Sequence, residues 1–295
     1  MADSTRPPHA QGNGLPAFIM GFVPGLLQLR LGQRQRALTA LLSCSAVMVV
    51  GWLVVKERLF YWGLAVPDGK SSFDSLARLG LAVLPEILNL PAQVLGSLSA
   101  YDGSATGLRM QRLPRDFEHI AGWLTAASGM LAAFWAAAGH WELRLRRDGE
   151  LDAQGQMPAP VANPALCAAL SWLVPGLGHA KAGQKDKGVL LGVAVAAVFV
   201  LGLLCSGGHA VDRAQYGVWW IGQNLFGGGS LFAALVTGPM RSVETPIDLD
   251  LGIVLCTVSG LMNLVVMCDA YTVAERSALP LPAGVAGGSD EGATT

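Results

Sequence analysis

The sequence predicts an all-α, polytopic helical membrane protein with two tandem repeats of about four apolar segments each, which would give six to eight transmembrane helices. Three observations predict this fold. The 295 residues are 52% hydrophobic and only 14% charged, whereas soluble domains carry about 25% charged residues. Four long apolar runs contain no Lys, Arg, Asp or Glu. Residues 15–36 resemble residues 166–187 without a gap.

The charge and cysteine content exclude several classes of protein. Lys and Arg total 20 against 21 Asp and Glu, and this balance argues against a nucleic-acid partner. The five cysteines lie inside apolar stretches without metal-ligand spacing, so we expect buried thiols, no metal and no cofactor. They are Cys44, Cys167, Cys205, Cys256 and Cys268.

Four segments are the clearest candidates for membrane spans, because about 20 apolar residues cross the hydrocarbon. The apolar run that precedes the first of them, from Leu15, is interrupted by Pro16, Gly21 and Pro24, so we interpret it as a retained membrane element and not a cleaved signal. The four candidates are Ala37–Val55, Ile120–Trp141, Val189–Cys205 and Leu251–Cys268.

Four other apolar segments are short or interrupted. Leu15–Leu29 and Pro164–Gly178 each carry a Pro-Gly pair, Leu79–Leu98 carries two prolines and three polar residues, and Val218–Met240 carries Gln223, Asn224 and three successive glycines. Lipid satisfies neither a broken backbone nor a polar side chain. We therefore expect these segments to face protein or a wet cavity, with the four clean helices shielding them.

These segments predict a division of the chain into five parts. Residues 15–141 form the first membrane repeat and residues 164–274 the second. The polar residues 142–163 between them read as a water-exposed linker. The termini, residues 1–14 and 275–295, are rich in polar or small residues and are predicted to be disordered.

The internal similarity indicates a duplicated membrane unit. With an offset of 151, Val23-Pro24-Gly25-Leu26 aligns with Val174-Pro175-Gly176-Leu177, and three basic positions stay basic. A weaker match, with an offset of 131, aligns Ser128-Gly129 with Ser259-Gly260. Four spans in each half would make the repeat parallel, and three would make it inverted; for eight spans the Lys and Arg residues divide equally, so orientation stays open.

The stretch Pro175-Gly176-Leu177-Gly178-His179, followed by Gly183-Gln184 and Lys187-Gly188, resembles the helical hairpin of small two-transmembrane-helix (TM-two) domains and of bacterial multi-pass proteins built around it. The first copy departs from the pattern at Leu27 and Ala37. The helix with Gly260-Leu261 and Asn263, ending at Asp269-Ala270, is similar to the last helix of such proteins. The resemblance implies membrane location and a hairpin, and it implies no catalytic residue.

The hairpin residues are candidates for a lipid-headgroup site, because basic side chains at the loop attract anionic lipid. The alternative is a purely structural hairpin with lysines that extend to the headgroup level. The candidate residues are Pro24, Gly25, Gly32, Gln33, Pro175, Gly176, Gly178, Lys181, Gly183, Gln184, Lys187 and Gly188.

Polar residues within apolar segments are a second set of candidates. Glu86, Asn89 and Gln93 share one helical face, which forms either an interior polar stripe or the wet side of a helix lying flat at the interface. Asn263 suits hydrogen bonding between helices. Asp269, His140 and His179 are expected at the interface. The complete set is Glu86, Asn89, Gln93, Gln223, Asn224, Asn263 and Asp269.

The sequence contains no catalytic or nucleotide-binding motif that we recognise, so we expect a non-enzymatic scaffold or assembly protein. The alternatives are a transporter or channel for a small solute, ion or lipid, which duplication and broken segments favour, and an intramembrane enzyme using Glu86 and Asp269. The expected location is a bacterial inner membrane, crossed several times. The expected partners are the bilayer, with anionic lipid, other proteins or a second copy of the chain as candidates.

Overall fold

The fold is known from a computed structural model that describes residues 20–55, 84–92, 94–95, 118–147, 162–213, 216–237 and 246–278. All regular secondary structure within these ranges is helical. Four helices are long and apolar enough to cross a membrane, and the prediction of a helical membrane protein is thereby confirmed. They are α3 (Arg34–Val55), α7 (Glu118–Arg147), α10 (Lys185–Cys205) and α13 (Leu249–Ala278).

Two of the long helices are central and two are peripheral. In α7 and α13, 44% of the most apolar window is buried, against 22% in α3 and α10, so α3 and α10 expose more apolar surface to lipid. Both α7 and α13 have 30 residues, or roughly 45 Å, which exceeds the hydrocarbon thickness of about 30 Å. They extend past their predicted ends, and the first part of the predicted linker is therefore helical.

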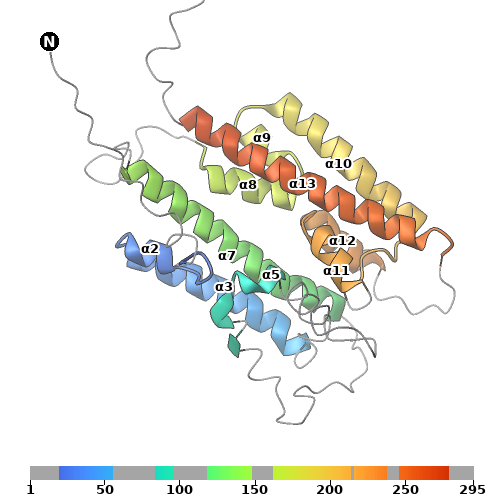
Figure 1. The fold of residues 1–295 in the computed structure, drawn as a ribbon, viewed down its shortest axis with the longest axis horizontal. Coiled ribbons are helices and arrows are strands. Elements are labelled where there is room, and N and C mark those ends of the chain that lie inside the picture. The colour runs from blue at the N-terminus through green and yellow to red at the C-terminus, as the bar shows by residue number, and fades with distance from the viewer. Residues whose placement is uncertain are drawn as a thin grey trace, which may run out of the picture.

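The long helices form two antiparallel pairs (Figure 1). Helix α3 packs on α7, and α10 packs on α13. A short helix, α8 (Pro164–Leu173), contacts both α7 and α13 and lies between the two pairs. Residues 275–278, predicted to be disordered, instead belong to the end of α13, because the helix continues past its apolar part. The rest of the predicted disordered termini and residues 148–161 of the linker lie outside the described residues.

The interrupted apolar segments form short helices in the ranges that the structure describes. Helix α8 has ten residues, or roughly 15 Å, half of the hydrocarbon thickness. The segment around Gln223 divides into two helices with a turn at Leu225–Gly227. The short helices are α2 (Leu26–Arg30), α5 (Leu84–Ile87), α9 (Leu177–Lys181), α11 (Gly217–Asn224) and α12 (Gly228–Thr237), besides α8.

The Pro-Gly pair forms the turn between α8 and α9. Val174 is extended (φ −138°, ψ 115°), as expected for a residue before proline. Gly176 follows with φ 82°, a conformation that costs other residues about 1–2 kcal/mol. A Cβ atom at Gly176 would also overlap the carbonyl group of Gly188 in α10. The absence of a side chain therefore lets the turn lie directly against the spanning helix.

The first copy of the hairpin has the same backbone geometry. Gly25 has φ 86°, and its Cβ would overlap the carbonyl group of Ala37, the residue that corresponds to Gly188. The amide of Gln33 donates to the carbonyl of Gln28 at 2.9 Å, and the corresponding amide of Gln184 donates to His179 at 2.8 Å. The resemblance between the two sequences thus extends to backbone hydrogen bonds.

The long helices of each pair also approach at matched positions. A Cβ at Gly51 of α3 would lie 2.8 Å from the carbonyl oxygen of Ala121 in α7. A Cβ at Gly202 of α10 would lie 2.9 Å from the carbonyl oxygen of Gly252 in α13. Gly51 and Gly202 differ by 151 residues, and Ala121 and Gly252 differ by 131, which are the two offsets seen in the sequence. All four residues are small, as a close helix crossing requires.

The deep ends of two short-helix hairpins meet inside the second half. The indole Nε1 of Trp172, at the end of α8, donates to the carbonyl of Asn224, at the end of α11, at 3.0 Å. A Cβ at Gly227 would overlap the carbonyl of Trp172. The first half has a corresponding contact, in which the amide of Leu90 donates to the carbonyl of Phe22 at 3.0 Å.

The hairpin glycines differ in a way that stability measurements can separate. Gly176→Ala should destabilise the protein by more than Gly183→Ala, because alanine at either site adopts an unfavourable positive φ but only the first overlaps backbone atoms. For Gly183→Ala we expect a loss of about 1–2 kcal/mol. Thermal unfolding of the purified chain in detergent micelles measures both, and equal losses would contradict the packing argument.

Candidate functional site

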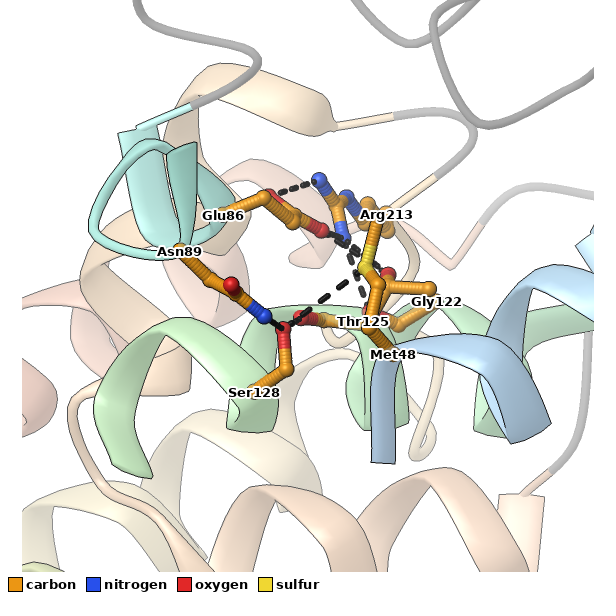
Figure 2. Close-up of polar contacts among 7 residues, drawn as sticks. All are labelled: Met48, Glu86, Asn89, Gly122, Thr125, Ser128 and Arg213. Atoms are coloured by element: carbon orange, nitrogen blue, oxygen red, sulfur yellow. Dashed lines mark hydrogen bonds and ion pairs between the residues drawn. The ribbon is translucent and has the colours of Figure 1, made fainter. Parts of the chain in front are cut away.

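A buried ion pair joins α5 of the first half to the connection between α10 and α11 in the second half (Figure 2). The guanidinium of Arg213 donates from Nη1 to Glu86 Oε1 at 2.6 Å and from Nη2 to Oε2 at 3.0 Å. The two side chains are only 3% and 1% exposed. Such a bidentate arrangement is the strongest form of carboxylate–arginine contact.

Helix α7 completes the surroundings of the pair. The hydroxyl of Thr125 lies 2.8 Å from Glu86 Oε1, and Arg213 Nη1 donates to the carbonyl of Gly122 at 2.7 Å. The guanidinium carbon also lies 4.5 Å from the ring centroid of Trp220, in the range of a cation–π contact. These contacts offset the large cost of removing both charges from water.

Asn89 lies beside the ion pair and links three helices. Its Nδ2 contacts the carbonyl of Cys44 in α3 at 3.3 Å and the hydroxyl of Ser128 in α7 at 3.4 Å. Glu86 and Asn89 are each 1% exposed, so this face points into the protein and not toward water. Of the predicted stripe, Gln93 lies outside the residues whose side chains the structure describes.

A second polar group surrounds the meeting point of α8 and α11. Asn263 of α13 donates from Nδ2 to the carbonyl of Ser171 at 3.1 Å and to that of Leu225 at 2.9 Å. Both acceptors belong to the C-terminal ends of short helices, where carbonyls lack partners within the helix. One side-chain amide therefore satisfies the broken ends of two helices.

Gln223 and Asn224 are buried at the same place. Gln223 Nε2 donates to the carbonyl of Ala210 at 3.0 Å and contacts that of Ile253 at 3.4 Å. The side-chain oxygens of Gln223, Asn224 and Asn263 are buried and have no hydrogen-bond partner among the described residues. The donors of this group are thus better satisfied than its acceptors.

A third polar group connects the second hairpin to α13. His179 Nε2 lies 2.7 Å from Asp269 Oδ2, and Lys187 Nζ lies 2.5 Å from the same oxygen. The Asp269 side chain is 39% exposed, and its position at the membrane interface stays a prediction. His179 is fully buried within the protein, because Gly178 lets α9 lie against α8 close to the Cys167 carbonyl; its position at the membrane interface stays a prediction. His140 is exposed.

Some of the predicted hairpin residues pack against other helices, and the others are exposed. The glycines of both turns position backbone, and Pro175 lies against Gly192 of α10. Lys181, Gln184 and Lys185 are exposed, whereas Lys187 pairs with Asp269. In the first copy, Gln33 instead hydrogen-bonds Glu142 of α7, and Arg36 pairs with the same carboxylate at 3.2 Å.

Sequence reasoning missed Arg213, Thr125 and Trp220. Arg213 stands in a polar stretch between two apolar segments, where a solvated arginine is the ordinary interpretation. A usable signal did exist, because a carboxylate within an apolar segment requires a partner. Arg213 follows the spanning segment of the other half, but its distance of 127 residues from Glu86 hides the pairing.

The loop that carries Arg213 holds further charge. Burial and the carboxylates of Asp212 and Asp250 raise the pKa of Tyr216 above its ordinary value of 10.0. Tyr216 is therefore neutral at physiological pH. Among the described residues, no group of three or more His, Cys, Asp and Glu side chains could hold a metal ion.

The buried pair should dominate the stability of the site. Glu86→Gln and Arg213→Met should each lower the free energy of unfolding by about 3–5 kcal/mol, because each leaves an uncompensated buried group. The double variant Glu86→Gln, Arg213→Met should lose less than the sum of the two single losses. As a control, Arg36→Met at an ion pair whose arginine side chain is 63% exposed should cost about 1 kcal/mol or less. Additive losses in the double variant would contradict direct coupling.

In comparisons with known proteins, one family model matches part of the chain. Residues 166–280 match the model of a family of unknown function (DUF6677). This range covers α9, α10, α11, α12 and α13 and all but the first two residues of α8. The search of curated proteins gave no match, and neither did the search of solved structures.

Proposed function

We propose that this protein is a non-enzymatic scaffold or assembly protein of the membrane. The observation that carries the proposal is that the buried polar side chains bind groups on other helices. Glu86 is bound on both oxygens by Arg213, and Asn263 links the ends of two short helices. These groups hold helices together, which is the role that polar residues take in a static membrane bundle.

The two halves are connected at both ends of the long helices. Arg144, near the end of α7, forms an ion pair with Glu275, near the end of α13. The Glu86–Arg213 pair connects the halves close to the opposite end of α7, since Arg213 also contacts Gly122. Two such connections favour a fixed arrangement of the halves, as a scaffold requires.

We further propose that the protein is a duplicated unit in which each half crosses the membrane twice. The matched glycine contacts and the two offsets support this proposal. The interrupted segments would enter the membrane and turn back, because helices of ten residues or fewer cannot cross it. This scheme has four crossings instead of the predicted six to eight, and it makes the repeat parallel.

The charge distribution supports an orientation. The side of the protein that carries both Pro-Gly hairpins is here called the hairpin face. With four crossings, 11 of the 20 Lys and Arg residues of the sequence fall on this side and nine on the other, and nine of the 11 have side chains that the structure describes. Positive loops remain in the cytoplasm, so we place the hairpin face on the cytoplasmic side of a bacterial inner membrane. The nine described basic residues are Arg30, Arg34, Arg36, Arg144, Arg146, Lys181, Lys185, Lys187 and Arg276.

The transporter hypothesis has one observation in its favour. The buried oxygens of Gln223, Asn224 and Asn263 lack partners among the described residues, and they lie where two broken helices meet. Transporters bind ions at such interruptions. A transporter for a small solute, ion or lipid therefore remains the second candidate.

Water access distinguishes the two candidates. In a cysteine-free background, Asn224→Cys should resist a membrane-impermeant thiol reagent, because a scaffold encloses this residue permanently; Lys185→Cys at the exposed hairpin is the control that should react fully. Proteoliposomes should also show no flux of K⁺, Cl⁻ or protons above empty vesicles. Rapid labelling of residue 224 together with flux would refute the scaffold proposal.

The orientation has its own test. With Lys185→Cys in the same background, intact cells should resist the impermeant reagent, whereas inverted membrane vesicles should be labelled, because the hairpin face lies inside. Labelling of intact cells would place this face outside and contradict the charge argument.

A further inference from the structure

A cavity of about 350 Å³ lies where the two halves meet, between α7 and α8. Ala133 and Ala137 of α7 form one wall, Ala169 of α8 forms another, and Trp172 and Met267 also line it. Its lining consists of apolar side chains throughout. The small alanine side chains on both helices create the space, because larger residues would close the gap between α7 and α8.

The cavity follows the axes of the helices. Its lining on α7 extends from Met130 to Ala137, and its lining on α8 extends from Ala165 to Trp172, so each wall is roughly 10 Å long. Ala165 lies beside the start of α8, and Trp172 lies at its deep end, next to Asn224. The cavity therefore runs from the hairpin face toward the middle of the membrane.

Two basic side chains lie above its outer end. One turn beyond Ala137, α7 carries the exposed His140. One further turn brings Arg144, whose side chain is 35% exposed and pairs with Glu275, so a phosphate there would share the guanidinium with that carboxylate. These residues share the α7 face that carries Ala137. A ligand in the cavity would thus have an apolar part beside the alanines and an anionic part beside Arg144.

We propose that this cavity binds one acyl chain of an anionic glycerophospholipid, with the phosphate near His140 and Arg144. The dimensions favour a chain over a partner helix. The walls are roughly 10 Å long, which is fewer than two helical turns and too short to seat a partner helix, whereas the volume of about 350 Å³ is in the range of small-ligand sites, which begin at about 300 Å³. The bilayer also supplies acyl chains at this depth. The proposal does not depend on the scaffold function.

Filling the cavity tests the proposal. The purified full chain is titrated with dipalmitoyl phosphatidylglycerol in detergent, and bound lipid is counted by native mass spectrometry. We expect one saturable lipid, bound at least tenfold more weakly by Ala169→Phe. Ala137→Phe fills the cavity from the opposite wall and should give the same loss if the first variant does not fold. Ala194→Phe on the exposed surface of α10 is the matched control and should bind normally.

A second measurement locates the chain. Phosphatidylglycerol with brominated acyl chains should quench a saturable part of the tryptophan fluorescence, and Trp172→Phe should abolish that part. Phosphatidylcholine, whose choline group cancels the phosphate charge, and palmitic acid, which has neither the phosphodiester nor the glycerol backbone, should bind more weakly. Unchanged lipid binding in both phenylalanine variants would overturn the proposal. So would a wild-type dimer that these variants dissociate without losing lipid, since that result assigns the cavity to a second copy.

Discussion

The structure depends on one constraint: a helix that ends inside the hydrocarbon must have its carbonyl groups satisfied by the protein itself. In the proposed topology α8 and α11 both end in this way, and the Asn263 amide donates to one carbonyl at the end of each helix. The Trp172 indole adds a further donor to the carbonyl of Asn224. These donors lie on α13 and α8. The short helices α8 and α11 and the long helix α13 therefore depend on one another for their position.

The fold class and the spanning helices follow from the sequence, since they depend on local apolar composition. The interruptions also follow from local signals: Pro175 and Gly176 end α8, and Gly227 adopts φ 63° in the turn between α11 and α12. What the sequence does not reveal is which interruptions meet. Arg213 and Glu86 are far apart in the chain, and a contact between distant segments produces no periodic pattern in the sequence. The burial of His179 is hidden for the same reason, because it depends on the contact between α9 and α8.

The two halves share backbone geometry but differ in the polar residues attached to it. Gln28 and His179 occupy matching buried positions; the first donates to the Trp135 carbonyl at 2.6 Å, whereas the second pairs with Asp269. Asn263 has only Ala132 as its counterpart. The second half therefore carries the polar connections at its broken helices, and it is also the half that matches a family model. Small residues maintain the common frame, since a Cβ is excluded at Gly25 and Gly176 alike.

The placement of the ion pairs supports the proposal of a fixed assembly over a moving one. A transporter that alternates access moves one repeat against the other about a central site, so at least one end of the interface must open in each state. Here Thr125, beside the Glu86–Arg213 pair, and Arg144, in the pair with Glu275, are 19 residues apart on α7, or roughly 28 Å. That distance is close to the hydrocarbon thickness. Opening at the first end would separate the buried arginine from its carboxylate and leave each charge without its partner. This would cost several kcal/mol. A rigid body with its halves held at both membrane surfaces is the arrangement that these contacts favour.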